Sequence, residues 1–227
     1  MPYLRHFELR ETPFGLTPDT SFLFPARSVQ QTLEALRAAV SSDEAFIEVT
    51  GAAGMGKTLL CRTFIALLDR ARWVALHIPN PGFDPRSLSI ALAEALSVPL
   101  SAATGAELDQ HSLRKGIGRA LLAHARAGRR VVLCLDESQA MPLETLEALR
   151  LLTNLETGKR KLLQVVLFGQ PELDRKLDSE TAGQLRQRIS VQREHAGLAD
   201  DEVGAYISHR LKVAGYAGPP LFSGAAV

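Results

Sequence analysis

Apolar and polar positions along the chain follow two periods, which divide it into alternating strands and helices. The segments 131–135 and 162–168 are almost entirely apolar, as expected for parallel strands covered on both faces. Between such segments, apolar residues recur at steps of three and four, which is typical of amphipathic helices. We therefore predict strands over 46–50, 73–78, 131–135, 162–168 and 189–195, and helices over 27–40, 85–96, 107–127, 142–155 and 200–213, with one more helix after Gly56.

This alternation predicts an α/β fold in which a mostly parallel sheet lies between layers of helices. It stops near Leu198, so we predict a core over 1–197 and a small helical unit over 198–227. The first 26 residues contain four prolines with aromatic residues between them. Because proline disfavours helix, we expect an extended segment there, with its aromatic side chains packed on the rest of the protein.

The composition is that of an ordinary globular protein, since 46% of the 227 residues are hydrophobic and 22% are charged. A net charge of +1 gives no overall attraction to nucleic acid, so we do not expect nucleic acid as a partner. No run of 18 apolar residues predicts a membrane span, and charged residues interrupt any signal-peptide core. We expect Cys61 and Cys134 to be two buried thiols in a cytoplasmic protein.

A glycine-rich segment follows the first predicted strand. Residues 51–58 fit the phosphate-binding pattern G-x-x-x-x-G-K-[ST], with a strand before and a helix after, as the pattern requires. The glycines let backbone N–H groups point at phosphate oxygens, while Lys57 neutralises phosphate charge and Thr58 binds Mg²⁺. The residues expected to contact the nucleotide are Gly51, Ala52, Ala53, Gly54, Met55, Gly56, Lys57, Thr58 and Leu59.

Two carboxylates, Asp136 and Glu137, follow the apolar segment 131–135. Open α/β sheets bind ligands at the carboxyl ends of their strands, where this pair falls. An acidic helix start after a strand is common, so the pair gains a specific meaning only together with the phosphate-binding segment. With that segment, it predicts Mg²⁺ binding by Asp136 and general-base catalysis by Glu137, and hence hydrolysis of ATP.

Further polar residues near the predicted strand ends have two interpretations each. Gln170 follows the strand 162–168, where its amide orients water and detects the γ-phosphate, or it is a turn residue before Pro171. Arg186 and Arg188 precede the last strand, and either is an arginine finger for a neighbouring subunit or an ordinary surface arginine. We expect the basic residues 159–161 in a solvated loop, with nucleic acid or lipid headgroups as the alternative.

The remaining reactive residue types do not form recognisable sites. The six histidines are scattered without the spacing of zinc ligands. No serine or cysteine lies in a nucleophile motif. The ligands predicted from the residues are therefore ATP and Mg²⁺, without zinc.

Several longer blocks resemble the general secretion pathway protein A (ExeA-type) branch of the AAA+ ATPases. They cover nearly the whole chain, at 14–19, 50–62, 135–140, 149–157, 162–173 and 206–211. Within that branch, the opening residues 3–7 resemble most the ATPase type of mannose-sensitive haemagglutinin (MSHA) type IV pilus biogenesis. The resemblance implies a AAA+ three-layer core with strand order 5-1-4-3-2, an N-terminal segment over adenine and a small helical lid. It also implies Gln170 as sensor 1, Arg188 as the preferred finger, and a homo-oligomer.

Two features depart from the pattern of that branch. Its lid usually carries a Gly-x-Pro-Arg block, and this sequence ends before one, so we expect a truncated lid. The larger secretion members add a membrane span and a peptidoglycan-binding domain, neither of which occurs in this sequence. A short pilus-type member, or a fragment of one, therefore fits better.

These features lead to one expected function and two alternatives. We expect an ATPase that drives assembly of secretion or MSHA-like pilus machinery, with inner-membrane assembly proteins as partners. Its expected location is cytoplasmic, including the periphery of the inner membrane. The alternatives are a DNA-binding transposition regulator, which the charge of +1 disfavours, and a nucleotide-gated scaffold with little turnover.

Overall fold

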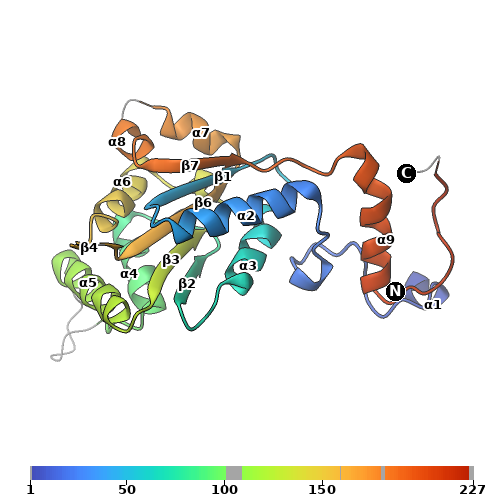
Figure 1. Ribbon diagram of the computed structural model, residues 1–227, viewed down its shortest axis with the longest axis horizontal. Coiled ribbons are helices and arrows are strands. Elements are labelled where there is room, and N and C mark those ends of the chain that lie inside the picture. Colours follow the sequence, from blue (N-terminus) through green and yellow to red (C-terminus); the bar gives the residue numbers. More distant parts are fainter. Residues whose placement is uncertain (1, 101–108, 159, 180–181, 225–227) are drawn as a thin grey trace.

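Five parallel strands form the central sheet, in the order β2-β3-β6-β1-β7 (Figure 1). The structure is a computed structural model, which describes residues 2–100, 109–158, 160–179 and 182–224. The strands are β1 Phe46–Thr50, β2 Trp73–Ile78, β3 Arg130–Leu135, β6 Leu163–Gly169 and β7 Ile189–Glu194. Counted within this sheet alone, the order is 5-1-4-3-2. This confirms the predicted α/β fold and the strand order that the resemblance implies.

The register of the strands brings the ends of β1, β3 and β6 to the same edge of the sheet. Thr50, the last residue of β1, pairs with Gly169, the last residue of β6. On the other side of β6, β3 runs parallel with Leu135 opposite Leu167. The segments that follow these three strands therefore start close together, and they contain most of the predicted site residues.

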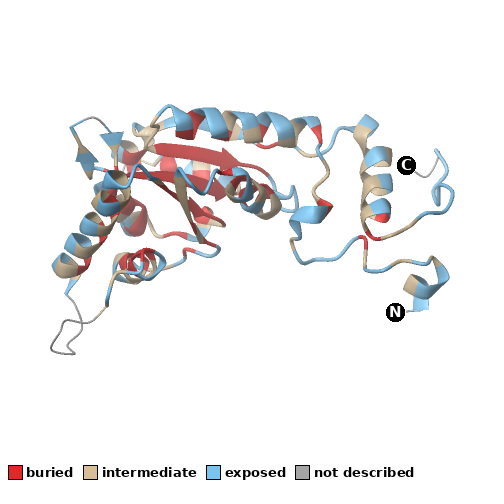
Figure 2. Ribbon diagram, turned by 60° about the horizontal axis from the view of Figure 1, so that its bottom comes forward, coloured by how far each residue is buried: buried red, intermediate tan, exposed pale blue. Residues whose placement is uncertain are grey.

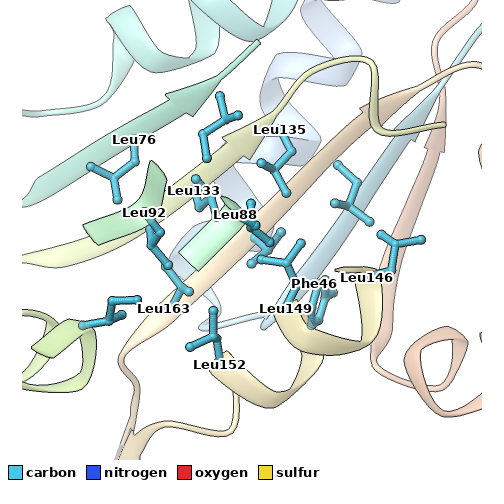
Figure 3. Close-up of a cluster of buried hydrophobic side chains, with 14 of the residues drawn as sticks. Phe46, Leu76, Leu88, Leu92, Leu133, Leu135, Leu146, Leu149, Leu152 and Leu163 are labelled. Atoms are coloured by element: carbon cyan, nitrogen blue, oxygen red, sulfur yellow. The ribbon is translucent and has the colours of Figure 1, made fainter. Parts of the chain in front are cut away.

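Helices cover both faces of the sheet, because alternate strand residues point to opposite sides. On β3, Leu133 packs in one hydrophobic cluster and its neighbour Cys134 in the other. The first cluster includes residues of α4 (Pro85–Ala95), α5 (Gln110–Arg126) and α6 (Leu143–Leu152), and Figure 3 shows the leucines of α4 and α6 against the strands. The second cluster includes residues of α2 (Arg27–Ser41) and α3 (Lys57–Leu67). The predicted three-layer arrangement is confirmed, with the buried strands at its centre (Figure 2).

The helix α9 (Val203–Val213) lies beyond the end of the sheet, beside the N-terminal segment (Figure 1). The Arg210 guanidinium lies 4.6 Å from the centre of the Phe22 ring, and its Nε donates to the Pro13 carbonyl at 2.5 Å. The Arg10 N–H donates to the Ala214 carbonyl at 2.8 Å. The first residues of the chain and α9 are therefore packed on each other.

The opening residues are not wholly extended, so that part of the prediction was wrong. They contain a short helix, α1 (Pro2–His6), and one 3₁₀ turn, η1 (Thr20–Phe22). Proline is tolerated in the first turn of a helix, where its missing N–H would have no partner, and Pro2 occupies that place. Asp19 caps η1 by accepting a hydrogen bond from the Ser21 N–H at 2.8 Å.

Further short elements of the described chain were not predicted, among them β4 (Glu156–Thr157), β5 (Arg160–Lys161), α7 (Pro171–Leu177) and α8 (Gly183–Arg186). The loop expected over 159–161 is a correction, because β5 pairs with β4 and Lys161 forms an ion pair with Glu156. Position 159, like 107 and 108 of the helix predicted over 107–127, falls outside the described residues. Among the described helices, none has the length and apolar character needed to cross a membrane.

Candidate nucleotide-binding site

The glycine-rich loop 51–56 connects β1 to α3 at the carboxyl edge of the sheet. Gly54 and Gly56 adopt φ values of 80° and 81°, a conformation that favours glycine. At Gly51, a Cβ atom would lie 2.7 Å from the His195 carbonyl oxygen, so the close approach of that backbone also requires glycine. Because α3 begins at Lys57, the free N–H groups of its first turn add to those of the loop.

Lys57 is the first residue of α3, and only 5% of it is exposed. Its ammonium group donates hydrogen bonds of 2.8 Å to the carbonyl oxygens of Gly51 and Ala52. Burial lowers the pKa of Lys57, and the charges of Glu137 and Asp136 oppose this shift. The lysine therefore holds the loop in shape and lies within electrostatic reach of both predicted carboxylates.

Asp136 and Glu137 follow β3 directly, where the sequence placed them. Asp136 is 2% exposed and accepts the backbone N–H of Glu137 at 3.0 Å. Glu137 has a φ of 56°, in the left-handed region, and it lines the same cavity as the loop. The two neighbouring carboxylates thus differ in exposure, with one buried and one facing the cavity.

The donor set near the loop suits Mg²⁺. Asp136 supplies a carboxylate, and Thr58, at the second position of α3, supplies a hydroxyl. Mg²⁺ prefers oxygen ligands and takes only one or two from the protein where substrate phosphates provide others. In the described part of the chain, no group of three or more His, Cys, Asp or Glu side chains is placed to hold a metal alone. The residues present therefore fit a metal that is shared with a bound nucleotide.

Gln139 links the two polar strand ends, and the sequence did not single it out. Its side-chain Nε2 donates to Glu137 Oε2 at 2.5 Å, and its Oε1 accepts from the Gln170 backbone N–H at 3.1 Å. Gln170 stands just before α7 and lines the same cavity as Glu137. The structure therefore brings Gln170 to the loop and carboxylates, as its position after a neighbouring strand predicted.

A cavity of about 620 Å³ lies between the loop, the N-terminal segment and α9. This is within the usual size range of sites for small molecules. Besides the loop, it is lined by Phe14, Phe24, Tyr206 and Arg210. The Tyr206 ring packs edge-on against Phe24, with centres 6.0 Å apart. Aromatic residues of the opening segment were expected to pack on the protein, whereas Tyr206 and Arg210 were not identified as site residues.

His195, directly after β7, is a further residue that the sequence did not identify. It is 3% exposed, and its ring nitrogens lie 3.1 Å from the Met55 carbonyl oxygen and 3.3 Å from the Thr32 hydroxyl. Burial lowers the pKa of His195, and the charges of Lys57 and Arg193 add to this. The ring therefore connects the loop to α2.

The profile of the AAA domain family matches residues 39–177, which include the loop, both carboxylates and Gln170. This chain belongs to the AAA domain family. Over 217 residues, or 96% of its length, this AAA domain is 36% identical to General secretion pathway protein A of Aeromonas hydrophila. It spans 39% of the length of that relative.

Solved structures share the fold of this AAA domain. The ORC2 protein of Aeropyrum pernix, in its ADPNP-ADP complexes, matches with a TM-score of 0.60 and 12% identity, over 87% of this chain and 56% of that one. CDC6P from Pyrobaculum aerophilum matches with a TM-score of 0.61 and 17% identity, over 89% of this chain and 55% of that one. At these identities the likeness shows the fold alone.

Arg186 and Arg188 of this AAA domain are not brought to its own loop. They precede β7, whose first residue Ile189 pairs with Phe46 at the start of β1, whereas the loop follows the end of β1. The two ends of β1 are about 13 Å apart at the usual rise per strand residue. The two arginines therefore lie at the opposite edge of the sheet from the cavity.

The two arginines differ in their partners. Arg186 is bound within the chain, with its guanidinium 3.1 Å from Glu48 and 3.0 Å from Asp178. The side chain of Arg188 forms no hydrogen bond or ion pair within the described residues and is half-buried. Of the two, Arg188 has the guanidinium that is not already engaged.

Proposed function

We propose that this AAA domain binds ATP with Mg²⁺ and hydrolyses it to ADP and phosphate. The observation that carries the proposal is the meeting of the glycine-rich loop, Lys57 and two carboxylates at one edge of the sheet, with Glu137 facing the cavity. A loop of this geometry suits a polyphosphate, because its N–H groups and the helix start attract anions. The carboxylates beside it suit the transfer of a phosphoryl group to water.

In this proposal each residue of the site has a separate role in the reaction. The loop and Lys57 neutralise the β- and γ-phosphates, and Thr58 and Asp136 hold Mg²⁺, which withdraws charge from the phosphate oxygens when bound. Glu137 takes a proton from the attacking water. The water oxygen bonds to the γ-phosphorus as the bond between the γ-phosphorus and the oxygen of the β-phosphate breaks. Gln170 is placed to orient that water and to detect the γ-phosphate.

The cavity beyond the loop provides a place for the adenosine part of the nucleotide. Its aromatic lining, from the N-terminal segment and α9, offers flat apolar surfaces for a purine ring. We therefore assign residues 1–197 to a nucleotide-binding core and 198–227 to a small helical lid. In this assignment the lid and the opening segment close over the base together.

We further propose that the protein acts as a homo-oligomer in the assembly of cell-envelope machinery. Arg188, at the edge opposite the cavity, is placed to serve a neighbouring subunit as its finger. The relative from Aeromonas hydrophila is named as a general secretion pathway protein, which supports secretion machinery as the partner. Assembly proteins of the inner membrane, of the secretion or MSHA-like pilus type, are the partners that we propose. The protein would then work in the cytoplasm or at the periphery of that membrane.

The test is turnover of ATP by the purified protein and by Glu137→Gln. We expect ATP binding by calorimetry to be retained and turnover to fall by about 100-fold or more, since general-base catalysis contributes that much. Glu144→Gln on the exposed start of α6 is the matched control and should leave turnover unchanged. Equal turnover of Glu137→Gln and the unmodified protein would remove Glu137 from the mechanism.

Three further outcomes separate the other interpretations. Flat calorimetry with ATP and Mg²⁺ would overturn the proposal as a whole. Binding without turnover by the unmodified protein, at any protein concentration, would leave a nucleotide-gated scaffold. Tight DNA binding that weakens steeply with salt would favour a transposition regulator.

A further inference from the structure

We propose that Gln139 is a positioning residue for hydrolysis, which holds the Glu137 carboxylate in place and links it to the start of α7. This inference deepens the proposed function and rests on it. Gln139 is half-buried in the 3₁₀ helix η2 (Ser138–Ala140), directly after the carboxylate pair. The motif formed by Asp136 and Glu137 assigns no role to Gln139.

The contact with Glu137 fixes one carboxylate oxygen and leaves the other available. Gln139 Nε2 donates to Glu137 Oε2 at 2.5 Å, and no described residue donates a hydrogen bond to Glu137 Oε1. The backbone below is held as well, because the Ser138 hydroxyl is buried and donates to the Leu135 carbonyl at 2.9 Å. With one carboxylate oxygen held and the other free, Glu137 is oriented to accept a proton.

The contact with α7 determines which way the Gln139 amide points. A backbone N–H only donates and an ionised carboxylate only accepts, so Oε1 must face the Gln170 N–H and Nε2 must face Glu137. A flipped amide would lose both hydrogen bonds. The side chain is therefore an oriented bridge between the general base and the candidate γ-phosphate sensor.

Lys176 ties the same segment to α7 a second time. Its ammonium group donates to the carbonyl oxygens of Gln139 and Met141, each at 2.6 Å. Because Gln170 precedes α7 and Lys176 belongs to its last turn, the helix holds Gln139 from both ends. A displacement of Gln170 by the γ-phosphate would therefore be passed to the Glu137 carboxylate through one side chain.

Two isosteric variants separate the two hydrogen bonds. When ionised, the glutamate of Gln139→Glu keeps an acceptor for the Gln170 N–H but cannot donate to Glu137, whereas Gln139→Met loses both bonds. Gln184→Ala, an exposed glutamine of α8, is the matched control. For each, kcat and KM for ATP are measured, with ATP binding by calorimetry and thermal unfolding to confirm the fold.

We expect both variants to lower kcat by about 10- to 100-fold, a part of the full contribution of a general base. KM and ATP affinity should stay within about threefold, because Gln139 orients the base and does not bind the nucleotide. Gln184→Ala should match the unmodified protein. A purely structural role would instead give normal kcat for Gln139→Glu, since that variant keeps the bond to α7.

The outcomes also separate this inference from the proposed function. Normal kcat in Gln139→Glu, or a rise in kcat, would overturn the inference while turnover by the unmodified protein upholds ATP hydrolysis. A loss of ATP affinity equal to the loss of kcat would overturn it too, because it would place Gln139 in nucleotide binding. If the unmodified protein binds no ATP, the proposed function itself fails first.

Discussion

A carboxyl group, Glu48, lies buried in the middle of β1, where it is 1% exposed. Burial raises the pKa of Glu48 from 4.5 to about 7, against the hydrogen bond from Gln192 Nε2 at 2.6 Å and the charge of Arg186. Asp174 and Asp178 raise the pKa further through their negative charges. The folded protein therefore holds a proton on Glu48 at pH values where the unfolded chain has released it.

This residue predicts how stability depends on pH. Because the folded pKa is the higher one, the contribution of Glu48 to the free energy of unfolding falls as pH rises from about 4.5 to about 7. The whole fall is about 3 kcal/mol. Glu48→Gln should remove it, which urea unfolding at pH 5, 6, 7 and 8 measures. Glu94→Gln on the exposed side of α4 is the control, and parallel curves for Glu48→Gln and the unmodified protein would contradict the prediction.

The two thiols give a second prediction at this scale. Cys61 and Cys134 are both fully buried, and a hydrogen bond with Cys134 together with burial raises the pKa of the Cys61 thiol. A thiol that stays protonated and covered reacts slowly with disulfide reagents. We expect such a reagent to label neither cysteine in the folded protein within minutes and both after urea unfolding. Rapid labelling of the folded protein would contradict this, because it would show that the hydrophobic cluster around the two thiols opens.

At the scale of elements, the strands were predictable and the short elements mostly were not. Strand β3 matches the apolar run 131–135 with only one residue added. The match is close because an apolar run of this kind fixes both the type and the length of a central strand. By contrast, β4 and β5 have two residues each and depend on each other for pairing. The helix α7 did carry a signal, with Pro171 in its first turn, acidic residues at its start and basic residues at its end.

The same distinction holds for the candidate site. The loop and the two carboxylates form local patterns, so the sequence predicted their positions. Gln139 meets Gln170 only because β3 and β6 are neighbours in the sheet, and no local pattern reports that order. Likewise, Tyr206 and Arg210 reach the cavity only once α9 is docked on the opening segment.

That docking predicts a local effect of Arg210. Its guanidinium lies over the Phe22 ring and its Nε donates to the Pro13 carbonyl. We expect Arg210→Ala to lower the free energy of opening of residues 10–24 by about 1–3 kcal/mol, the sum of a cation–π contact and a hydrogen bond. Hydrogen exchange would show faster exchange there and unchanged exchange in the sheet. Arg210→Lys keeps the charge but not the planar guanidinium, so its exchange rates should lie between those of Arg210→Ala and the unmodified protein. Uniformly faster exchange across the chain would contradict the prediction.

At the scale of the whole molecule, the groups that we propose for hydrolysis lie at opposite edges of one sheet. The loop and Glu137 are at the carboxyl edge, and Arg188 precedes the amino end of β7. A single chain cannot bring them together without breaking the sheet. Two chains can, if the amino edge of one faces the cavity of the next, and this geometry predicts complementation between two inactive variants.

In the proposed mechanism, Arg188→Ala keeps its own base but lacks the finger, and Glu137→Gln keeps the finger but lacks the base. Each alone should turn over ATP at least about 100-fold more slowly than the unmodified protein. In an equal mixture, about a quarter of the sites pair an intact base with a neighbour's intact arginine, so turnover should recover to about a quarter of normal. Arg175→Ala, on the exposed face of α7, is the control and should be normal. A mixture no more active than its parts would place the finger elsewhere, because complementation requires only that base and arginine come from different chains.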